Sequence, residues 1–419
     1  MMHANGWREQ TFGSCVRLIS GGTPSKSNST YWGGSIPWVS CKDMKTPRIH
    51  DAEDHLTELG AANGTKMVSR GTILIVVRGM ILAKEFPVAR AMRSVCFNQD
   101  LKALQCLSNV EEEFFFYWLL ANAHEVRGVA DEAAHGTKRL QTDRLQSLRV
   151  VVPPQSIQKK ISATLSTYDD LIENNTRRIQ ILERNAQAIY REWFVHFRYP
   201  RHGQNKLVAS ALGKIPQGWS VRRLDEVAEV NASAVRRGHE LENILYVDIA
   251  SVGTGRIDKI EPMAFAAAPG RARRIVQHGD TIWSCVRPNR KSFSLILSPP
   301  AELIVSTGFA VLTPTKVPFS FLHQAVTTDE FVGYLTNHAT GAAYPAVTAK
   351  DFEAAKLVVP DEPLLRQFHE HCEPMMLLKD NLLRKNANLR RTRDLLLPKL
   401  VSGALDVSKL DIEDGGVTA

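Results

Sequence analysis

Residues 161–193, with the sequence ISATLSTYDDLIENNTRRIQILERNAQAIYREW, decide the fold. Positions spaced alternately by four and three residues, from Ile161 to Trp193, are apolar or aromatic with the single exception of Asn175. Such a repeat of 3.5 residues, sustained over several heptads, is typical of a helix that buries a narrow stripe against another helix. The stretch therefore predicts a long helix in a coiled coil.

The same stripe returns about 207 residues further along the chain. In this second copy every other stripe position is apolar, and the positions between them are mixed. A domain of ~150 residues is too small to bury a stripe of this length, so we expect the two helices to pair. A duplicated chain favours a pseudo-two-fold arrangement, which makes the pair antiparallel. The side chains predicted to line the seam between the helices are Ile161, Leu165, Ile172, Ile179, Leu182, Ile189, Phe368, Met375, Leu382, Leu389 and Leu396.

Two asparagines, Asn175 and Asn386, also fall on this seam. A polar residue there can fix the register of the helices at some cost in stability. Alternatively, each asparagine marks a local bulge or an exposed end of the seam. The residues alone leave both interpretations open.

The duplication extends beyond the helices. Gly6-Trp7 opens the first half of the chain and Gly218-Trp219 opens the second. Each half closes with a similar strand pattern, LRVVVP at 148–153 and KLVVP at 356–360. Between these anchors the halves have little sequence in common, which indicates one scaffold that carries two different surfaces.

These patterns together predict an α+β fold with a pseudo-two-fold internal repeat. Two globular domains, residues 1–153 and 201–360, are expected to alternate with two helical spacers, residues 154–200 and 361–405, before a tail of residues 406–419. The spacers are expected to pair as an antiparallel coiled coil.

The composition is that of a globular protein. Of 419 residues, 44% are hydrophobic and 23% are charged. No apolar run reaches the ~18 residues of a membrane span, and residues 1–8 lack the apolar core of a signal peptide. Six cysteines are scattered without a Cys-x-x-Cys pair, which argues against a zinc site and favours buried thiols in a reducing compartment. We therefore expect a cytoplasmic protein.

The net charge is +8, with a sequence pI near 9.1. The basic excess falls mostly in two blocks, residues 1–152 and 201–359. Two basic blocks are expected if each domain touches a phosphate backbone. Charge alone is a weak signal, because many basic proteins bind no nucleic acid.

Several motifs resemble one known family. Residues 21–25 (GGTPS), 31–34 (YWGG) and 36–39 (IPWV) resemble the opening of the target-recognition domain of type I restriction–modification specificity subunits. Residues 171–174 (LIEN) resemble the central conserved region of that family, and residues 393–400 (RDLLLPKL) resemble its C-terminal one. The ordered set, more than any single motif, makes the resemblance specific.

The second domain departs from the family pattern. It lacks a Gly-Gly-Thr-Pro segment, and it has Ser306-Thr307-Gly308 where the first domain has Asn98-Gln99-Asp100. The departure puts the loop assignments of the second domain in doubt, but not its place in the repeat.

The resemblance implies a non-catalytic scaffold whose two recognition domains each read one half of a bipartite double-stranded DNA target. It implies that the paired helices set the spacing between the halves and dock two adenine-methylating subunits, which use S-adenosylmethionine. Translocating restriction endonuclease subunits, which use ATP, would add to this core. The chain itself would then carry no cofactor and no metal.

The length of the stripe is compatible with that role. A helix from Ile161 to Trp193 spans about 48 Å at ~1.5 Å per residue. The same distance covers roughly 14 base pairs of B-DNA at ~3.4 Å each. Half-sites more than one helical turn apart would fit this length.

In the first domain, residues 26–31 form a polar loop rich in donors for phosphates and base edges. The alternative is a solvated loop held by Trp32 and Trp38, both of which we expect in the core. The DNA-binding candidates of this domain are Lys26, Ser27, Asn28, Tyr31, Lys42, Lys45, Lys138 and Arg139.

In the second domain, the densest basic stretch runs from Arg271 to Lys291 and contains one acidic residue, Asp280. Arginine offers paired donors to guanine and to phosphate, and asparagine pairs with adenine. The alternative is an ordinary solvated surface. The candidates of this domain are Arg273, Arg274, Arg287, Asn289, Arg290 and Lys291, with Arg236 and Arg237 as weaker ones.

No catalytic motif is present in the sequence. There is no Walker A loop and no Gly-x-Ser-x-Gly elbow, and His369-Glu370-His371 lacks the spacing of a zinc-binding His-Glu-x-x-His helix. We therefore expect a protein that is not an enzyme. Two alternatives remain: a DNA-binding regulator or architectural protein without a catalytic partner, and an enzyme whose site is assembled across domains.

Overall fold

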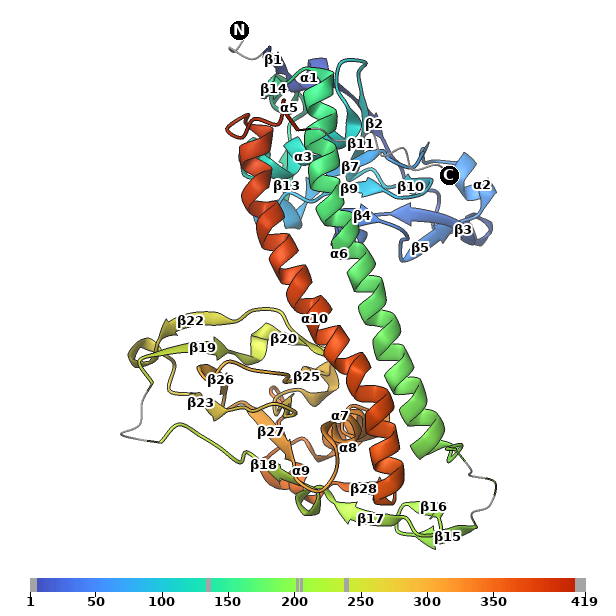
Figure 1. Ribbon diagram of the computed structural model, residues 1–419. Coiled ribbons are helices and arrows are strands. Elements are labelled where there is room, and N and C mark those ends of the chain that lie inside the picture. The colour runs from blue at the N-terminus through green and yellow to red at the C-terminus, as the bar shows by residue number, and fades with distance from the viewer. Residues whose placement is uncertain (1–5, 133–136, 201–202, 204–205, 237–240, 411–419) are drawn as a thin grey trace. The chain divides into compact units, whose positions relative to one another are not determined.

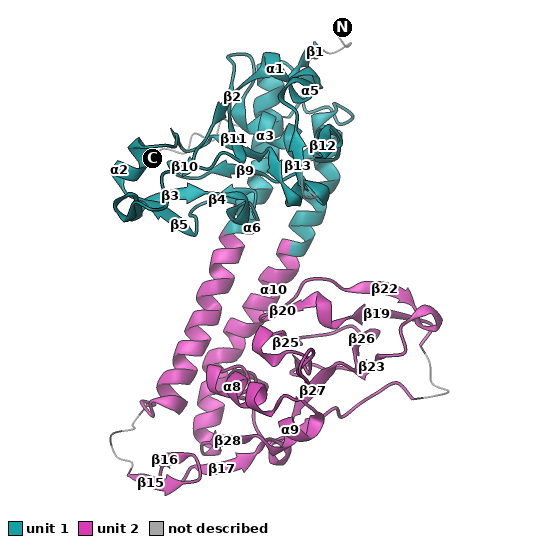
Figure 2. Ribbon diagram, turned by 180° about the vertical axis from the view of Figure 1, so that it is seen from behind, with its two compact units in different colours: residues 1–173, 387–419 teal, residues 174–386 magenta. Residues whose placement is uncertain are grey.

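The computed structural model describes residues 6–132, 137–200, 203, 206–236 and 241–410 (Figure 1). The chain divides into two compact units, which Figure 2 colours separately. Unit 1 comprises residues 1–173 and 387–419, and unit 2 comprises residues 174–386. Each unit therefore combines one β-rich domain with part of both long helices.

Unit 1 is built around two mixed sheets. The five-stranded sheet has the order β2 (Val16–Ser20), β11 (Leu101–Cys106), β7 (Ile73–Val76), β9 (Val88–Ala91) and β4 (Arg48–Ile49). The four-stranded sheet has the order β5 (Asp54–Leu56), β3 (Trp32–Val39), β10 (Val95–Phe97) and β6 (Met67–Val68). Smaller sheets are β12 (Ala130–Glu132), β13 (Lys138–Leu140) and β8 (Arg78–Gly79), and the pair β1 (Arg8–Thr11) and β14 (Arg149–Val152).

Short helices complete the first domain. They are α1 (Phe12–Cys15), α2 (Glu58–Ala62), α3 (Glu112–Ala121), α4 (Ala123–Gly128) and α5 (Thr142–Ser147), with the 3-10 turns η1 (Ser29–Tyr31), η2 (Cys41–Asp43) and η3 (Met80–Ala83). Helix α3 carries the run FFFYW at 114–118, which is buried on every side. Because a helix that is apolar all round must be enclosed, α3 lies in the core of the unit.

Unit 2 repeats this plan around two four-stranded sheets. One sheet has the order β18 (Ala228–Val230), β27 (Phe309–Pro314), β24 (Thr281–Ser284) and β25 (Phe293–Leu295). The other has the order β22 (Glu261–Ala264), β19 (Asn243–Val247), β26 (Leu303–Ser306) and β23 (Ala272–Ile275). Two-stranded pairs are β15 (Leu207–Ser210) with β16 (Gly213–Pro216), β17 (Ser220–Arg223) with β28 (Lys356–Val359), and β20 (Val252–Gly253) with β21 (Arg256–Ile257).

The helices of the second domain are α7 (Phe319–Ala325), α8 (Asp329–His338) and α9 (Ala349–Ala354), with the 3-10 turns η7 (Leu224–Glu226), η8 (Ile249–Ser251), η9 (Phe265–Ala267) and η10 (Pro288–Arg290). The strand pairings match those of unit 1. Cys96 lies parallel to Trp38 in unit 1, and Ile304 lies parallel to Tyr246 in unit 2, an offset of 208 residues at both positions. The duplication predicted from the sequence is therefore a duplication of backbone hydrogen bonds.

Two long helices run through both units. Helix α6 (Gln155–Tyr190) ends in a π-helical turn, Arg191–Val195, and α10 spans Glu362–Val401. In unit 2, Asn175 and Glu183 of α6 pair with Asn386 and Lys379 of α10. In unit 1, Asp169 of α6 pairs with Arg393 of α10, while Lys160, earlier on α6, donates to Ser408 O, beyond the end of α10. Residue numbers thus fall along α10 as they rise along α6, so the helices are antiparallel within each unit. The predicted α+β fold with two paired helices is confirmed.

The predicted seam residues differ in their burial. Six are buried, namely Ile161, Leu165, Ile172, Ile179, Phe368 and Leu382. Five are partly exposed, namely Leu182, Ile189, Met375, Leu389 and Leu396. Asn175 Nδ2 donates to Asn386 Oδ1 at 2.9 Å, and Asn386 Nδ2 donates to Thr176 Oγ1 at 3.2 Å. The first interpretation of the asparagines is therefore the one observed: they pair across the helices, and Asn386 is buried.

Within the described part of the chain, none of the helices has the length and apolarity needed to cross a lipid bilayer.

Candidate nucleic-acid interface

The polar loop of the first domain is held by two tryptophans. Trp38 Nε1 donates to Gly22 O at 3.0 Å, and Trp32 Nε1 donates to Ser25 O at 3.1 Å. Trp38 is buried and Trp32 half-buried, as expected. The backbone is tightly packed here, since a Cβ on Gly22 would come within 2.0 Å of Gly64 O. A rigid backbone thus presents the polar side chains of residues 25–31.

Of the candidates on this loop, Lys26 and Ser27 are exposed, whereas Asn28 and Tyr31 are half-buried. Asn28 serves a local purpose: its Oδ1 accepts from the backbone N of Thr30 at 3.1 Å and caps η1. Such a cap is the usual function of an asparagine at the start of a helical turn. Lys26 and Ser27 are therefore better placed than Asn28 to meet a ligand.

Residues 98–100 connect the loop to β8. Gln99 Oε1 accepts from Thr23 Oγ1 at 2.6 Å, and Asp100 Oδ1 accepts from Arg78 Nε at 2.7 Å. The segment Asn98-Gln99-Asp100, which the sequence comparison of the two halves singled out, is therefore a structural bridge. It joins the polar loop to a pair of basic strands.

This basic strand pair consists of β8 and β13, which are antiparallel neighbours in one sheet although about 60 residues separate them in sequence. Arg139 lies opposite Arg78, and Lys138 lies opposite Gly79. Cys41 Sγ is 3.7 Å from Arg78 O, which places η2 beside the same strand pair. The structure thus brings Lys138 and Arg139 together with the turn that carries Lys42, although about 100 residues separate them in sequence.

The two lysines near η2 differ in their availability. Lys42 Nζ forms ion pairs with Asp54 at 2.9 Å and Glu53 at 3.2 Å, and the hydrogen bond to Asp54 raises the pKa of Lys42. Lys45 is exposed, and no ion pair to it is found within the described ranges. A contact from Lys42 to DNA would have to compete with two carboxylates.

Arg78 was not among the sequence candidates. A signal was present, because Val77-Arg78 directly follows β7 and Val286-Arg287 follows β24, the equivalent strand of the second half, after one further residue. The dipeptide therefore recurs near the end of the same strand in both halves, displaced by one position. Arg78 is exposed and belongs to the basic strand pair.

In the second domain the basic stretch does not form one continuous patch. Arg273 and Arg274 lie on β23 of one sheet, and the remaining candidates lie on η10 after a strand of the other. The guanidinium of Arg273 stacks on Phe265, 4.9 Å from the ring centre. Arg274 Nε is buried and has no hydrogen-bond partner among the described residues. Neither arginine projects freely, and the basic stretch is divided between two sheets.

The acidic partners of this stretch lie outside it in the sequence. Asp280 is buried, accepts from Thr313 Oγ1 at 2.7 Å, and has a pKa raised by burial. It cannot neutralise a surface arginine. Arg271 instead pairs with Asp248, and Lys291 pairs with Asp329 at 2.6 Å.

The turn η10 carries the best exposed candidates of the second domain. Arg287 and Lys291, on either side of it, have left-handed backbones with φ of 51° and 54°. Asn289 and Arg290, within the turn, are exposed. Arg287 lies over the ring of Tyr344 at 4.7 Å. Of the two weaker candidates, Arg236 is exposed; Arg237 lies outside the described residues.

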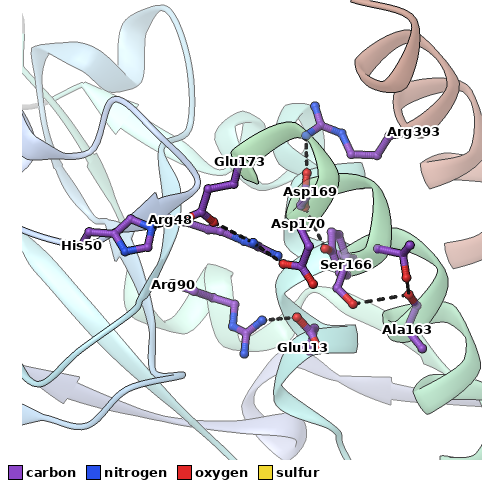
Figure 3. A network of polar contacts seen from close by, with 12 residues as sticks. Arg48, His50, Arg90, Glu113, Ala163, Ser166, Asp169, Asp170, Glu173 and Arg393 are labelled. Atoms are coloured by element: carbon purple, nitrogen blue, oxygen red, sulfur yellow. Dashed lines mark hydrogen bonds and ion pairs between the residues drawn. The ribbon is translucent and has the colours of Figure 1, made fainter. Parts of the chain in front are cut away.

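A polar network fixes the first domain to its helices (Figure 3). Arg48 of β4 pairs with Asp170 and Glu173 of α6. The preceding residue of α6, Asp169, accepts from Tyr117 Oη at 2.7 Å and from Arg393 of α10. Burial disfavours the charged guanidinium, but the hydrogen bond to Asp169 raises the pKa of Arg393.

The structure offers no catalytic constellation within the residues it describes. No group of three His, Cys, Asp or Glu side chains there is placed to hold a metal ion. His369 Nδ1 is 2.9 Å from Ser320 Oγ, and His371 Nδ1 is 2.7 Å from Gln367 O, so each histidine has its own separate contact. Burial raises the pKa of Cys15, Cys41, Cys96 and Cys285 to about 11 and that of Cys106 and Cys372 to about 12. Reactive nucleophiles need a lowered thiol pKa.

Comparisons with known proteins agree on one family. A family model described as the type I restriction modification DNA specificity domain matches residues 5–184. The MjaIX specificity subunit of Methanocaldococcus jannaschii is 25% identical, covering 96% of this chain and 94% of that protein. The EcoR124I/EcoR124II specificity subunit of Escherichia coli is 29% identical over 202 residues, which are 47% of this chain and 50% of that protein.

A solved structure shares the fold. The crystal structure of the S subunit of a type I restriction–modification system from M. genitalium has a TM-score of 0.63 and 16% sequence identity. The match covers 96% of this chain and 97% of that one. At this identity the match establishes the fold alone.

Proposed function

Because the chain belongs to the family of type I restriction–modification DNA specificity subunits, we propose that its two β-rich domains each bind one half of a split double-stranded DNA target. Specificity subunits are non-catalytic and carry no cofactor; catalysis, S-adenosylmethionine and ATP belong to the modification and restriction subunits. The contacts to DNA are then made by this chain. Its location would be the cytoplasm, where that DNA is found.

One observation carries the assignment of the contacts. Each domain places an arginine just after the equivalent strand, Arg78 one residue after Val77 and Arg287 two residues after Cys285. Val77 and Cys285 are equivalent, because Leu140 N donates to Val77 O and Val347 N donates to Cys285 O, both at 2.9 Å. The two arginines therefore lie one position apart on the duplicated scaffold, which suits two half-sites that differ in sequence.

In the first domain, the proposed DNA surface comprises the basic strand pair β8 and β13, the turn η2 and the polar loop. It includes Arg78 together with Lys26, Ser27, Tyr31, Lys42, Lys45, Lys138 and Arg139. In the second domain it is centred on η10, with Arg287, Asn289, Arg290 and Lys291. Arg273, Arg274 and Asn28 keep a smaller part, because each already has a structural contact or is enclosed.

Selection from a pool of random-sequence duplexes, followed by sequencing, tests the proposal without assuming any target sequence. Wild-type protein should enrich a motif with two fixed halves and a spacer. Arg139→Ala should relax only one half of this motif, at a cost of about 1–3 kcal/mol at the position lost. Arg149→Ala is the matched control, since that arginine is 83% exposed on β14 of the same domain and pairs with Glu9.

An unsplit motif, or none, would overturn the proposal. If Arg139→Ala weakened all sequences equally while Arg149→Ala did not, the strand pair would contact phosphate alone; if both variants did so, Arg139 would have no specific contact to DNA. A regulator that acts without catalytic partners would show the split motif but would not co-purify with methyltransferase subunits.

We also propose that the exposed face of each long helix docks a modification subunit. Leu171 of α6 in unit 1 is 46% exposed, and Leu378, the equivalent residue of α10 in unit 2, is 37% exposed. An apolar side chain left out of a helix seam at the same place in both repeats is expected at a contact with a repeated partner. Leu171→Glu with Leu378→Glu should abolish co-purification of modification subunits, whereas the exposed Leu59→Glu should not.

The helices are proposed to set the spacer between the half-sites. Removing residues 174–180 and 381–387, one heptad at equivalent places in α6 and α10, would shorten both helices by about 10 Å. The selected motif should then keep both halves while its spacer shortens by roughly three base pairs. An unaltered spacer would contradict this proposal while leaving the DNA contacts untouched.

A further inference from the structure

The turn formed by residues 341–345 in unit 2 holds an aromatic side chain in solvent. Thr340 and Ala346 exchange two backbone hydrogen bonds of 2.9 Å, which close the turn, and Gly341 has a φ of +101° that suits glycine. Tyr344, near the tip, is 69% exposed. Tyrosines usually bury most of their ring. A closed turn that displays such a ring calls for a ligand or a neighbouring side chain to explain it.

The neighbouring side chain is Arg287. Its backbone N donates to Pro345 O at 2.7 Å, and its Nη2 donates to Ala343 O at 3.2 Å. Its guanidinium carbon lies 4.7 Å from the centre of the Tyr344 ring. The arginine is therefore fixed at three points, the backbone, one guanidinium nitrogen and the stacked face. Its backbone is in the left-handed region, with a φ of 51°, which non-glycine residues adopt mainly where surrounding contacts impose it.

Most of the hydrogen-bonding capacity of this arginine is unused. A guanidinium has five N–H donors, and the bond to Ala343 occupies one of them. Lys291, on the other side of the turn, is neutralised by Asp329. No carboxylate within the described ranges forms an ion pair with Arg287. Its charge is held in place without a partner of opposite sign.

We propose that Tyr344 positions the Arg287 guanidinium to read a guanine edge in the half of the DNA target bound by the second domain. This inference rests on the proposed function. Paired N–H groups of arginine match O6 and N7 of guanine in the major groove. An arginine whose plane is already stacked loses less conformational freedom on binding than a free one. Tyr344 is thus a positioning residue, and Arg287 supplies the base contact.

The experiment uses the full-length chain and the random-duplex selection described above, followed by binding measurements on the selected duplex and on duplexes with one base pair changed. Arg287→Ala should lower discrimination at a single G·C pair of one half-site by roughly 5- to 150-fold. Arg287→Lys should lose most of the same discrimination, because an ammonium has no paired planar donors. The other half-site should keep its sequence.

The tyrosine variants separate positioning from direct contact. Tyr344→Phe keeps the ring and should discriminate as the wild type does. Tyr344→Ala removes the stacking face and should reduce discrimination at the same G·C pair and at no other. Arg256→Ala is the control for loss of a surface arginine in this domain, since Arg256 is 59% exposed and pairs with Asp258.

The outcomes are distinguishable. If wild-type protein selects no split motif, the proposed function itself fails. If it selects one and Arg287→Ala binds every duplex more weakly without relaxing any base pair, Arg287 contacts phosphate and the inference is overturned. It is also overturned if Tyr344→Ala leaves the G·C preference intact. Amide exchange of each variant verifies that unit 2 is still folded.

Discussion

Both domains pack apolar side chains against their helices, but the first adds a network of buried ion pairs, whereas the second adds a cluster of aromatic rings. In unit 1, Arg48 reaches from β4 to Asp170 and Glu173 on α6, and Asp169 pairs with Arg393 (Figure 3). Asp169 also accepts from Tyr117 Oη. In unit 2, Phe194 contacts the rings of Phe368 at 4.9 Å, Phe321 at 5.1 Å and Trp219 at 5.8 Å. One scaffold thus joins its helices in two chemically different ways.

The repeat allows equivalent residues of the two helix pairs to be compared one by one. Adding 207 to Asp169 and subtracting 207 from Arg393 gives Met376 and Ala186, both buried. The ion pair of unit 1 therefore has an apolar counterpart in unit 2. In the same way, the pair Asn175 and Asn386 corresponds to Leu382 and Ile179. The backbone repeat tolerates either solution as long as each polar group finds a partner.

The largest expected effect comes from breaking the ion pair. Arg393→Ala leaves Asp169, whose side chain is 10% exposed, without its cation. The free energy of unfolding of unit 1 should fall by about 3–5 kcal/mol, the usual cost of orphaning a buried charge. Urea unfolding monitored by hydrogen exchange in each unit measures this loss locally.

The matched variant sharpens the comparison. Asp169→Met combined with Arg393→Ala and Tyr117→Phe copies the apolar pair of unit 2 into unit 1 and should recover most of the loss, because neither a charge nor the hydroxyl that donates to Asp169 is left buried without a partner. If this triple variant were as unstable as Arg393→Ala, the polar and apolar contacts would not be interchangeable and the comparison would fail.

The next effect is a pH dependence confined to unit 2. Burial lowers the pKa of His323 to about 3, with Lys379 as a lesser cause. The unfolded chain takes up this proton near pH 6.5 and the folded one does not, so stability falls as the pH drops below 6.5. Between pH 6.5 and 5 the loss should approach ~2 kcal/mol.

Phe116 of α3 occupies the position of unit 1 equivalent to His323, so His323→Phe is the informative substitution. It should flatten the pH dependence of unfolding in unit 2 and leave unit 1 unaffected. An unchanged slope between pH 6.5 and 5 would show that other groups dominate the titration.

A smaller effect is expected at the asparagine pair. Replacing Asn175 with Leu and Asn386 with Ile copies the buried pair Leu382 and Ile179 and should raise the free energy of unfolding by about 1 kcal/mol. Asn386→Ile alone should destabilise, because the amide of Asn175 then loses its acceptor at 2.9 Å. Denaturant midpoints of the single and double variants decide between these outcomes.

The smallest effect concerns thiol chemistry. With every cysteine pKa raised to about 11 or 12, native protein should react slowly with a disulfide reagent at pH 8. Cys41, which is half-buried beside Arg78, should react before Cys15, Cys96 and Cys372, which are buried. A thiol in either unit that reacted as fast as free cysteine would contradict this burial.

The sequence predicted the repeat and the helix pair well, because heptad spacing and duplicated strands report backbone geometry directly. It predicted the candidate surface less well. The run from Arg271 to Lys291 looked continuous, but two sheets divide it and side chains such as Arg273 stack on local rings. Charge spacing along a chain carries no information about which sheet each residue enters.

The bridge through Gln99 and the exposed ring of Tyr344 were also missed. Both depend on contacts between segments distant in sequence, Thr23 with Gln99 and Arg287 with residues 343–345. A single sequence offers no periodic signal for such contacts. Arg78 could have been found, because its dipeptide is repeated after the equivalent strand of the second half.

The discontinuity of unit 1 has a consequence for synthesis on the ribosome. Leu400 and Val401, near the end of α10, belong to the same apolar core as Ile161 and Leu165 of α6. A nascent chain completes the first β-rich domain early but must wait for more than half of its remaining length before that core closes. At ribosomal rates of ~5–20 residues per second the delay is on the order of tens of seconds. During that interval the start of α6 presents an uncovered stripe, so premature termination after the second domain would leave an aggregation-prone product instead of a functional half.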